Sequence, residues 1–600
     1  MKNIRFPTRK DDGFFMRNSM RIPAHRTPET FGAARGTIKS SRPAGQIKNI
    51  QMKKNINRML LWFLAALTLA GCSIDRKPEA IFSDGDFWNT QSDLMYAANR
   101  LYQQLAPNWN DTRSDESVAI AINTISNGTR EVPATSGDWS DRYKEIFTAN
   151  NILEKGQRAN VSETIRNRYF GEARFFRAYA YLNLLQKYGD VPLLLKTLDY
   201  NSPELLMPRT PRTEVIKQIY DDLDFAAAWL PAVAALPAAE YGRVTKSAAW
   251  ALKARAALYE GTRLKFHGQG GWQEHLQAAT EAAANVMGQG HGLYASYENL
   301  FKEVSDGPAN KENIFVKVYG ESAANPILTH SNSRALANGA NAITRNMIRM
   351  YLYTDGLPAF NTDNTPAASR SAYFVPEANE TSYNTVLQNR DPRLAATVFA
   401  MGENSYGRPW IPSISIGGRT SYGSKKGYTN ADDLSQRATV DRLLIRYAEV
   451  LLIYAEAKYE LAEAISDEDL NNTINLLRAR VGMPVKLTNA FVTANHLDMR
   501  EEIRRERAVE LALEGFRYDD LIRWKTAETV LPKELLGGKF FAAEWIGTNP
   551  NTLNLNADKI LVVEPASSRA FRPDRDYLYP VPLNEIALSK NNVKQNPNWK

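Results

Sequence analysis

Residues 162–192 read SETIRNRYFGEARFFRAYAYLNLLQKYGDVP and decide the class of fold. Ser162 is a suitable helix N-cap, and Gly189 followed by Pro192 ends a helix, so the sequence predicts one helix up to Tyr188. Its small and large apolar side chains do not form a single stripe. They lie on one side at Ala173, Phe176, Ala180 and Leu184, and on others at Ala178, Tyr181, Leu182 and Leu185. A helix of this kind is packed on more than one side, which indicates a core built of helices.

Amphipathic segments recur on both sides of this helix. Apolar residues at helical spacing predict helices over 93–105, 139–155, 213–230, 244–261, 273–287, 443–464, 467–481 and 498–514. Successive helix pairs of about 30 to 40 residues are typical of tetratricopeptide-like stacking, although no repeat consensus is legible. The predicted fold class is therefore mainly α, with a tetratricopeptide-like scaffold of helix pairs.

Residues 301–437 have a different character. Residues 314–319 alternate like a strand, and the rest is rich in Gly, Asn, Ser, Pro and aromatic residues. We expect a large, irregular, loop-rich insertion with few short strands, placed between the helical parts 81–300 and 438–600 of one scaffold. Binding residues are concentrated on loops that a rigid scaffold holds, so 301–437 is the predicted ligand-binding region.

An export signal lies inside the chain, at residues 52–71. It starts with the basic stretch MKKNINR, continues with an apolar run and ends in Leu69-Ala70-Gly71. The run has about 13 residues, whereas a helix needs about 20 to cross a bilayer, so we expect a signal peptide that is removed. Residues 1–51 precede this complete signal, and we interpret them as an overextended start.

Cys72 follows the signal directly. The sequence Leu69-Ala70-Gly71-Cys72 resembles the lipobox of bacterial lipoproteins, in which the cysteine becomes the lipidated first residue. The alternative is an ordinary secretory signal with a chance cysteine. No other cysteine occurs in the 600 residues, so no intrachain disulfide can form. Residues 72–80 are polar and suit a short tether.

The formal charge of +8 comes from residues that precede Cys72. Eleven Lys and Arg against three acidic residues give residues 1–51 a charge of +8, and the signal adds +3, so residues 72–600 carry −3. The basic character therefore belongs to parts that the mature protein should lack. This removes the electrostatic case for a nucleic-acid partner.

Local motifs of catalytic or metal sites are absent from the sequence. The five histidines after Cys72 form no i,i+4 pair and no HExxH motif, and neither a G-x-S-x-G elbow nor a Walker-type loop occurs. We expect no catalytic site, no metal site and no cofactor. An active site assembled from residues that are distant in sequence stays open as an alternative.

Glu506, Glu510 and Glu514 recur every four residues on one predicted helix. Glycosidases use two carboxylates about 5 to 9.5 Å apart, so this stripe is a candidate for hydrolysis. A stripe of this kind normally marks a solvated or ion-paired helix face, and arginines of the same helix, at 504, 505 and 507, offer cations. We expect a structural role for the three glutamates.

Sugar binding requires flat aromatic faces for the C–H surfaces of a sugar ring, with amides and carboxylates for its hydroxyl groups. Aromatic residues with an adjacent amide lie just beyond the first predicted helix, and others lie in or beside the loop-rich region. The predicted ligand-binding residues are Trp109, Asn110, Trp272, Tyr319, Tyr353 and Trp410. Trp109 is the strongest candidate, and packing in the core is the alternative for each ring.

Several segments resemble the SusD/RagB family and follow its order over nearly the whole chain after Cys72. They are residues 171–179 with 187–193, 243–246, 355–358, 390–394, 446–457, 503–507 with 510–524, and 579–586 with 595–599. The segment RYAEVLLIYAEA at 446–457 is the most specific of them.

This resemblance implies an outer-membrane lipoprotein, facing the cell surface, that caps a SusC-like TonB-dependent transporter and captures glycan. It also implies ligand contacts near Trp109. We therefore expect a lipid-anchored protein that binds an oligosaccharide reversibly and hands it to the transporter. Two alternatives remain: binding of peptide or another nutrient with the same partner, and a surface glycoside hydrolase.

Overall fold

The structure is a computed structural model that describes residues 87–600 except 106–110, 321–327, 406 and 415–417. All described elements belong to the compact unit Phe82–Lys600. The predicted overextended start, signal peptide, lipidated Cys72 and tether lie outside the described residues. No helix in the described part of the chain is long and apolar enough to cross a membrane.

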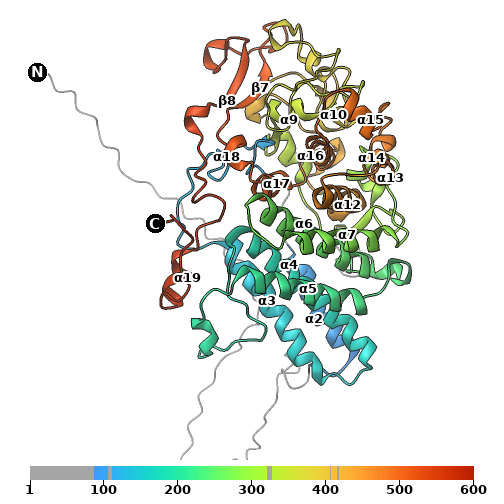
Figure 1. Ribbon diagram of the computed structural model, residues 1–600, viewed down its shortest axis with the longest axis vertical. Helices are drawn as coiled ribbons and strands as arrows, with labels where there is room; N and C mark the ends of the chain where they lie inside the picture. The colour runs from blue at the N-terminus through green and yellow to red at the C-terminus, as the bar shows by residue number, and fades with distance from the viewer. Residues whose placement is uncertain (1–86, 106–110, 321–327, 406, 415–417) are drawn as a thin grey trace, which may run out of the picture. The chain divides into compact units, whose positions relative to one another are not determined.

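Six helices form the first part of the scaffold. They are α2 (Gln91–Gln104), α3 (Gly137–Lys155), α4 (Glu163–Tyr188), α5 (Arg212–Trp229), α6 (Lys246–Phe266) and α7 (Trp272–Met287). From α3 onward each helix packs against the next, and α2 packs on α3 and α4. The helices lie one after another in the lower half of Figure 1. This confirms the predicted mainly helical fold with stacked pairs.

Helix α4 begins and ends where the sequence predicts. The Ser162 hydroxyl accepts a hydrogen bond from the Ile165 N–H at 3.3 Å, and Gly189 ends the helix with a φ of 73°. Glycine adopts this left-handed conformation at little cost because it has no Cβ. Phe175 and Phe176 are buried and meet the ring of Phe315 edge to face, so the helix contacts the centre of the chain as well as its helical neighbours.

The second helical part completes the same core. Its helices are α12 (Tyr447–Ala462), α13 (Asp467–Asn471), α14 (Ile474–Arg480), α15 (Asn489–Ala494), α16 (Met499–Glu510), α17 (Arg517–Arg523), α18 (Ala527–Val530) and α19 (Leu583–Leu588). Helix α12 packs against α6 and α7 on one side and α16 on another. One continuous cluster of buried apolar residues therefore includes both helical parts.

Three predicted helices differ from the structure. Residues at the start of the predicted helix 443–464 form strand β6 (Arg442–Arg446), which pairs antiparallel with β2 (Asn313–Lys317). The predicted helix 467–481 breaks into α13 and α14 at residues 472–473, and the predicted helix 498–514 ends at Glu510. The apolar pattern continues through each break, and a short apolar run does not distinguish a strand from a helix.

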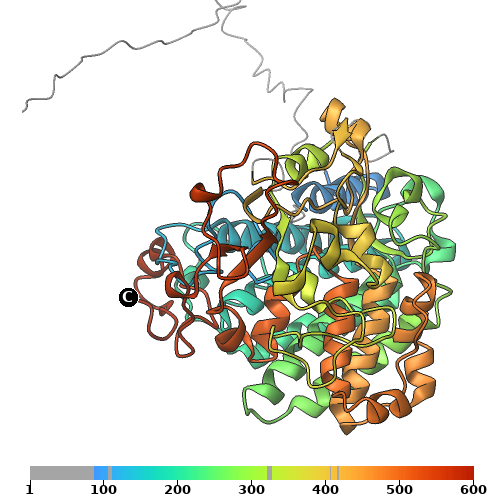
Figure 2. The same cartoon turned by 90° about the horizontal axis from the view of Figure 1, so that it is seen from above.

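The loop-rich region holds only short elements, as predicted. Its helices are α8 (Asn332–Ala337), α9 (Arg345–Met350), α10 (Pro392–Thr397) and α11 (Asn430–Ser435). The other two-stranded ladders pair β1 (Ser117–Val118) with β3 (Ala342–Ile343), β4 (Asn404–Ser405) with β5 (Arg408–Pro409), and β7 (Leu535–Lys539) with β8 (Ile560–Glu564). A second apolar cluster packs this region on Ala508, Val509 and Ala512, at and just beyond the end of α16. Figure 2 shows its yellow segments beside the orange C-terminal helices.

Helix α7 offers a test of the close helix packing. Ala283 is fully buried between helices, whereas its neighbour Ala284 is exposed. We expect Ala283→Leu to lower the free energy of unfolding by about 1–3 kcal/mol because the added methylenes overpack a filled core. The matched variant Ala284→Leu should change it by less than about 0.5 kcal/mol. Urea denaturation of both variants measures the difference, and equal effects would show that α7 is not packed as described.

Candidate functional site

The structure brings together the ends of α2 and β2, two segments that lie more than two hundred residues apart in sequence. The Lys317 ammonium donates a hydrogen bond to the Tyr102 carbonyl, in the last turn of α2, at 2.6 Å. The C-terminal end of a helix carries a partial negative charge, which favours a cation there. Burial lowers the pKa of Lys317. Trp109 and Asn110 follow this end of α2 in sequence but lie outside the described residues.

Tyr319 lies two residues beyond Lys317 and is held by its neighbours. Its N–H donates to Asp441 at 2.9 Å, and its ring meets the ring of His330 edge to face at 4.8 Å. The His330 Nε2 lies 3.0 Å from the Val440 carbonyl, while Nδ1 accepts from the Asn332 N–H at 3.2 Å. These partners require a neutral ring with the proton on Nε2, and burial correspondingly lowers the pKa of His330.

The backbone beside Tyr319 is fixed at two further points. Gly320 and Leu328 form an isolated antiparallel bridge, with the Gly320 N–H donating to the Leu328 carbonyl at 2.6 Å. Asp306 accepts a hydrogen bond from the Asp441 N–H at 3.1 Å. Burial, and then the nearby Asp441 carboxyl, raise the pKa of Asp306 to about 8. We call this group of linked residues, Tyr102, Lys317, Tyr319, His330 and Asp441, the α2–β2 face; Lys317 and Asp441 are its buried members.

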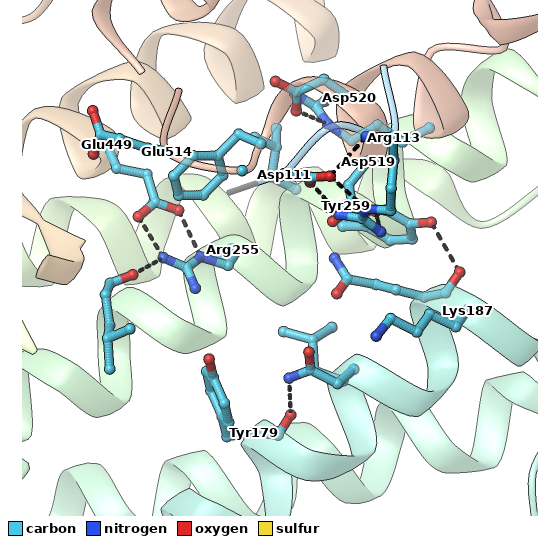
Figure 3. Close-up of a pocket in the computed structure, with 18 of the residues that line it drawn as sticks. Asp111, Arg113, Tyr179, Lys187, Arg255, Tyr259, Glu449, Glu514, Asp519 and Asp520 are labelled. Carbon is cyan, nitrogen blue, oxygen red and sulfur yellow. Dashed lines mark hydrogen bonds and ion pairs between the residues drawn. The ribbon is translucent and has the colours of Figure 1, made fainter. Parts of the chain in front are cut away.

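A polar cavity of about 420 Å³ opens beside the segment that follows Asn110 (Figure 3). Its walls come from α3, α4, α6, β6, α12, α16, α17, parts of residues 111–125 and Tyr579. Its charged side chains are Arg113, Lys187, Arg255, Arg442, Arg446, Arg507 and Arg523 against Asp111, Asp138, Glu449, Glu514, Asp519 and Asp520. The cavity has the size of small-molecule sites, which measure about 300 to 1,000 Å³, but it is more polar than most.

The charges in this cavity are paired across its walls. Arg255 and Glu449 form a two-pronged ion pair with both N···O distances at 2.6 Å (Figure 3). Arg113 donates to Asp111 at 2.8 and 2.6 Å and lies 3.6 Å from Asp519. Burial raises the pKa of Asp519 although its side chain is still 28% exposed, so the exposed part faces the cavity. Paired charges and amides suit a ligand rich in hydroxyl groups.

The segment that leads into this cavity is anchored to the ends of α16 and α17. Asp115 pairs with Arg517 at 2.9 Å, and the Glu116 carboxylate accepts a hydrogen bond from the Leu513 N–H at 2.5 Å. Leu513 has a φ of 62°, an unusual value for leucine, and this hydrogen bond helps to hold it. Burial raises the pKa of Glu116 to about 8.

The three glutamates of α16 and the turn after it are buried and ion-paired. Glu510 accepts hydrogen bonds from Arg446 at 2.7 Å, Arg480 at 2.6 Å and Arg393 at 2.9 Å. Burial alone would raise its pKa, but these guanidinium groups lower it well below the usual range. We call the following residues the charge cluster: Glu312, Arg393, Lys426, Arg446, Arg478, Arg480, Glu506, Glu510 and Glu514.

The predicted ion-paired role of these glutamates is confirmed, but the predicted partners are wrong. Arg505 pairs with Glu502 and Arg507 with Asp520, while the Arg504 guanidinium lies over aromatic rings. The cations of the charge cluster come from other segments, since Arg505 and Arg507 are already paired with other carboxylates. The described residues contain no group of three His, Cys, Asp or Glu side chains placed to hold a metal ion.

The other predicted ligand residues lie in three separate places. Trp272 is the first residue of α7, partly exposed, with its ring 5.0 Å from the Lys265 ammonium. Tyr353 is buried beneath Arg390, whose guanidinium lies 4.3 Å from the ring. Trp410 is 1% exposed and stacks on Phe399. For Tyr353 and Trp410 the structure corrects the expectation of loop-borne binding rings, because both rings pack inside the loop-rich region.

The sequence contained a signal for the cavity that the prediction missed. Arg255 interrupts an alanine-rich helix, and Glu449 directly precedes the apolar run VLLIYA. A charge inside a buried helix requires a partner, since an unpaired buried charge is very costly. Such residues indicate a polar junction between helices, although spacing alone does not identify the partner.

Comparison with known proteins places the chain in a family. The family model described as the SusD family matches residues 306–599, and one described as starch-binding, associating with the outer membrane, matches residues 85–258. The chain belongs to the SusD/RagB family. SusD-like protein P2 of Formosa agariphila is 24% identical over 577 residues, covering 90% of this chain and 99% of that protein.

Solved structures of SusD-like proteins share the fold. A SusD-like carbohydrate-binding protein from Bacteroides fragilis superposes with a TM-score of 0.69 and 27% identity, covering 84% of this chain and 99% of that one. A laminarin-binding SusD-like protein gives a TM-score of 0.55 and 21% identity over 85% of this chain and 99% of that one. The similarity to the latter shows the fold alone.

Removing one member of the charge cluster tests its contribution to stability. We expect Glu510→Ala to lower the free energy of unfolding by about 3–5 kcal/mol because three guanidinium groups lose their shared carboxylate in a buried place. The control Asp221→Ala removes one half of the exposed Lys217–Asp221 pair and should cost less than about 1 kcal/mol. Chemical denaturation measures both, and a small loss for Glu510→Ala would contradict the cluster's structural role.

The raised pKa of Glu116 predicts that the stability of the protein depends on pH. Burial raises the pKa of the folded-state Glu116 carboxyl to about 8 from its ordinary value of 4.5, so the unfolded chain releases this proton first as pH rises. The wild type therefore loses stability from Glu116 between about pH 5 and 8, whereas Glu116→Gln does not. We expect the variant to become steadily more stable relative to wild type over this window. A stability difference between Glu116→Gln and wild type that does not change with pH would show that the Glu116 carboxyl is already ionised in the folded protein, and would contradict the prediction.

Proposed function

We propose that this SusD/RagB-family protein binds glycan at the cell surface and delivers it to a SusC-like TonB-dependent transporter in the outer membrane. Family membership supports this function, as does the likeness to a carbohydrate-binding relative across 99% of that relative's length. The charge of −3 after Cys72 argues against a nucleic-acid ligand. The ligand is an oligosaccharide that is held and released without chemical change.

The α2–β2 face is the proposed ligand site, and one contact carries this assignment. The 2.6 Å bond from Lys317 to Tyr102 fixes the end of α2 beside the strand that leads to Tyr319. Trp109 and Asn110 follow α2 in sequence. Aromatic rings with an adjacent amide are suited to stacking on a sugar ring and bonding its hydroxyl groups. The polar cavity, which Asp111 lines, holds further charged and amide groups suited to hydroxyl groups of a ligand.

Attachment to the membrane is proposed to use two contacts. A lipid on Cys72 anchors the chain, and docking on the transporter supplies the second contact. A single acyl chain gives only marginal membrane binding, so two attachments account for stable association. Movement of the protein against the transporter then passes the glycan inward.

A binding assay that also reads products tests this function. Purified protein is incubated with soluble starch, laminarin and a peptide digest, and retention and cleavage are both measured. We expect retention of at least one polysaccharide with no product. Tyr319→Ala should weaken that retention about tenfold because a stacking surface is lost, which corresponds to about 1.4 kcal/mol.

Tyr200→Ala is the matched control, since this tyrosine is 88% exposed and lies between α4 and α5. It should leave retention unchanged. Retention of peptide alone would favour the nutrient-binding alternative. Release of shortened glycan by the wild type would overturn the proposal in favour of a surface hydrolase.

A further inference from the structure

A second hollow, of about 400 Å³, lies at the beginning of β2, apart from the polar cavity. Its walls come from parts of the segment 233–245, the turn after α7 at 289–291, parts of residues 308–311, and β2. We call it the β2 groove. Val233, Leu236, Pro237, Pro308 and Ile314 make much of its surface apolar. Its volume lies within the usual range of small-molecule sites.

Asn313 leaves a hydrogen-bond acceptor without a partner at this groove. Its amide nitrogen donates to the Tyr241 hydroxyl at 2.8 Å, which fixes the orientation of the amide. The amide oxygen is buried and meets no donor among the described residues. Leaving an acceptor unsatisfied costs about 1–3 kcal/mol, so a native structure normally supplies a donor.

His291 leaves a second acceptor at the same groove. Its Nδ1 lies 3.0 Å from the Lys311 carbonyl, and since a carbonyl only accepts, Nδ1 carries the proton. Nε2 is then an acceptor, and it is buried without a partner in the part of the chain that the structure describes. The ring stacks on Tyr447 at 6.0 Å and 24°, which holds it in this orientation. A ligand with two donors would satisfy both residues.

The charge around the groove indicates which kind of hydrogen-bond donor a ligand should carry. Within the described residues its lining includes no Asp or Glu, while Lys311 is exposed at its rim and Arg243 is bonded to Glu172 at 2.7 Å. The described lining offers no carboxylate to a cationic ligand, which disfavours an ammonium or guanidinium donor and favours neutral donors such as hydroxyl groups. A sugar ring combines such hydroxyl groups with an apolar C–H face that fits the wall of Pro237 and Ile314.

We propose that the β2 groove is a second saccharide site, which takes a mono- or disaccharide with its hydroxyl groups donating to Asn313 Oδ1 and His291 Nε2. It is additional to the α2–β2 face and independent of it. Strand β2 joins the two places, because Asn313, Ile314 and Val316 line the groove and the same strand continues to Lys317 of the face.

Filling the groove tests this proposal. Maltose and cellobiose serve as probes in saturation-transfer NMR, in a Tyr319→Ala background that weakens the α2–β2 face. Ala234 lines the groove and is exposed, whereas its exposed neighbour Ala235 does not line it. We expect Ala234→Trp to reduce transfer to the disaccharide at least tenfold and Ala235→Trp to preserve it. Equal signals from both variants would overturn the proposal.

A second variant tests the proposed hydrogen bond from the saccharide to His291 Nε2. His291→Phe keeps a flat ring on Tyr447 but removes Nε2, so the dissociation constant of the disaccharide should rise roughly fivefold. A dissociation constant that His291→Phe leaves unchanged would refute the second site. The absence of saturation transfer to both maltose and cellobiose before any groove residue is substituted would refute it as well. Retention of polysaccharide is measured separately, on protein that keeps Tyr319. The result for the α2–β2 face is therefore independent of the result for the β2 groove.

Discussion

The shared carboxylate of Glu510 is the interaction on which the rest of this molecule depends. It receives guanidinium groups from α10, β6 and α14, while Arg446 reaches on to Glu312 and Glu514. Each buried ion costs several kcal/mol to desolvate, and that cost is offset only when the partners are all present in good geometry. Segments that are distant in sequence are therefore held in one arrangement, and the loop-rich region cannot shift against the helices without exposing unpaired charge.

This constraint explains how a region with few regular elements presents a defined surface. Strand β2 begins directly after Glu312, and β6 ends at Arg446, so the ladder between them starts at the charge cluster. The strand then leads away from the cluster to Lys317 and Tyr319. The rigidity of the α2–β2 face thus derives from a polar core and not from the length of its two-stranded sheet.

Most of the helical scaffold was predictable from the sequence because its signals are local. Helix α4 follows from Ser162, Gly189 and the apolar residues between them, and α7 follows from one apolar stripe. Strand β6 was missed because Leu443 to Ile445 form a short apolar run whose state depends on its pairing with β2. The strand near Ile314 was predicted, but its partner was not, since spacing along the chain does not reveal a contact across a hundred residues.

The candidate site was less predictable than the fold because it, too, depends on contacts between residues that are distant in sequence. Tyr319 was identified as an aromatic residue beside a loop, whereas Lys317 and His330 matter through contacts with Tyr102 and Val440 that only tertiary structure creates. Trp410 shows the opposite case, because a tryptophan among glycines and prolines suggests an exposed loop, yet the surrounding rings form a core of their own.

The bridge between Gly320 and Leu328 has an evolutionary consequence. The chain is fixed on both sides of this bridge, so residues can be added or removed between Gly320 and Leu328 without shifting the segments outside it. The entropic cost of a longer loop grows only slowly with its length. Insertions and deletions between these two positions can therefore accumulate in evolution while the chain on either side of the bridge keeps its place.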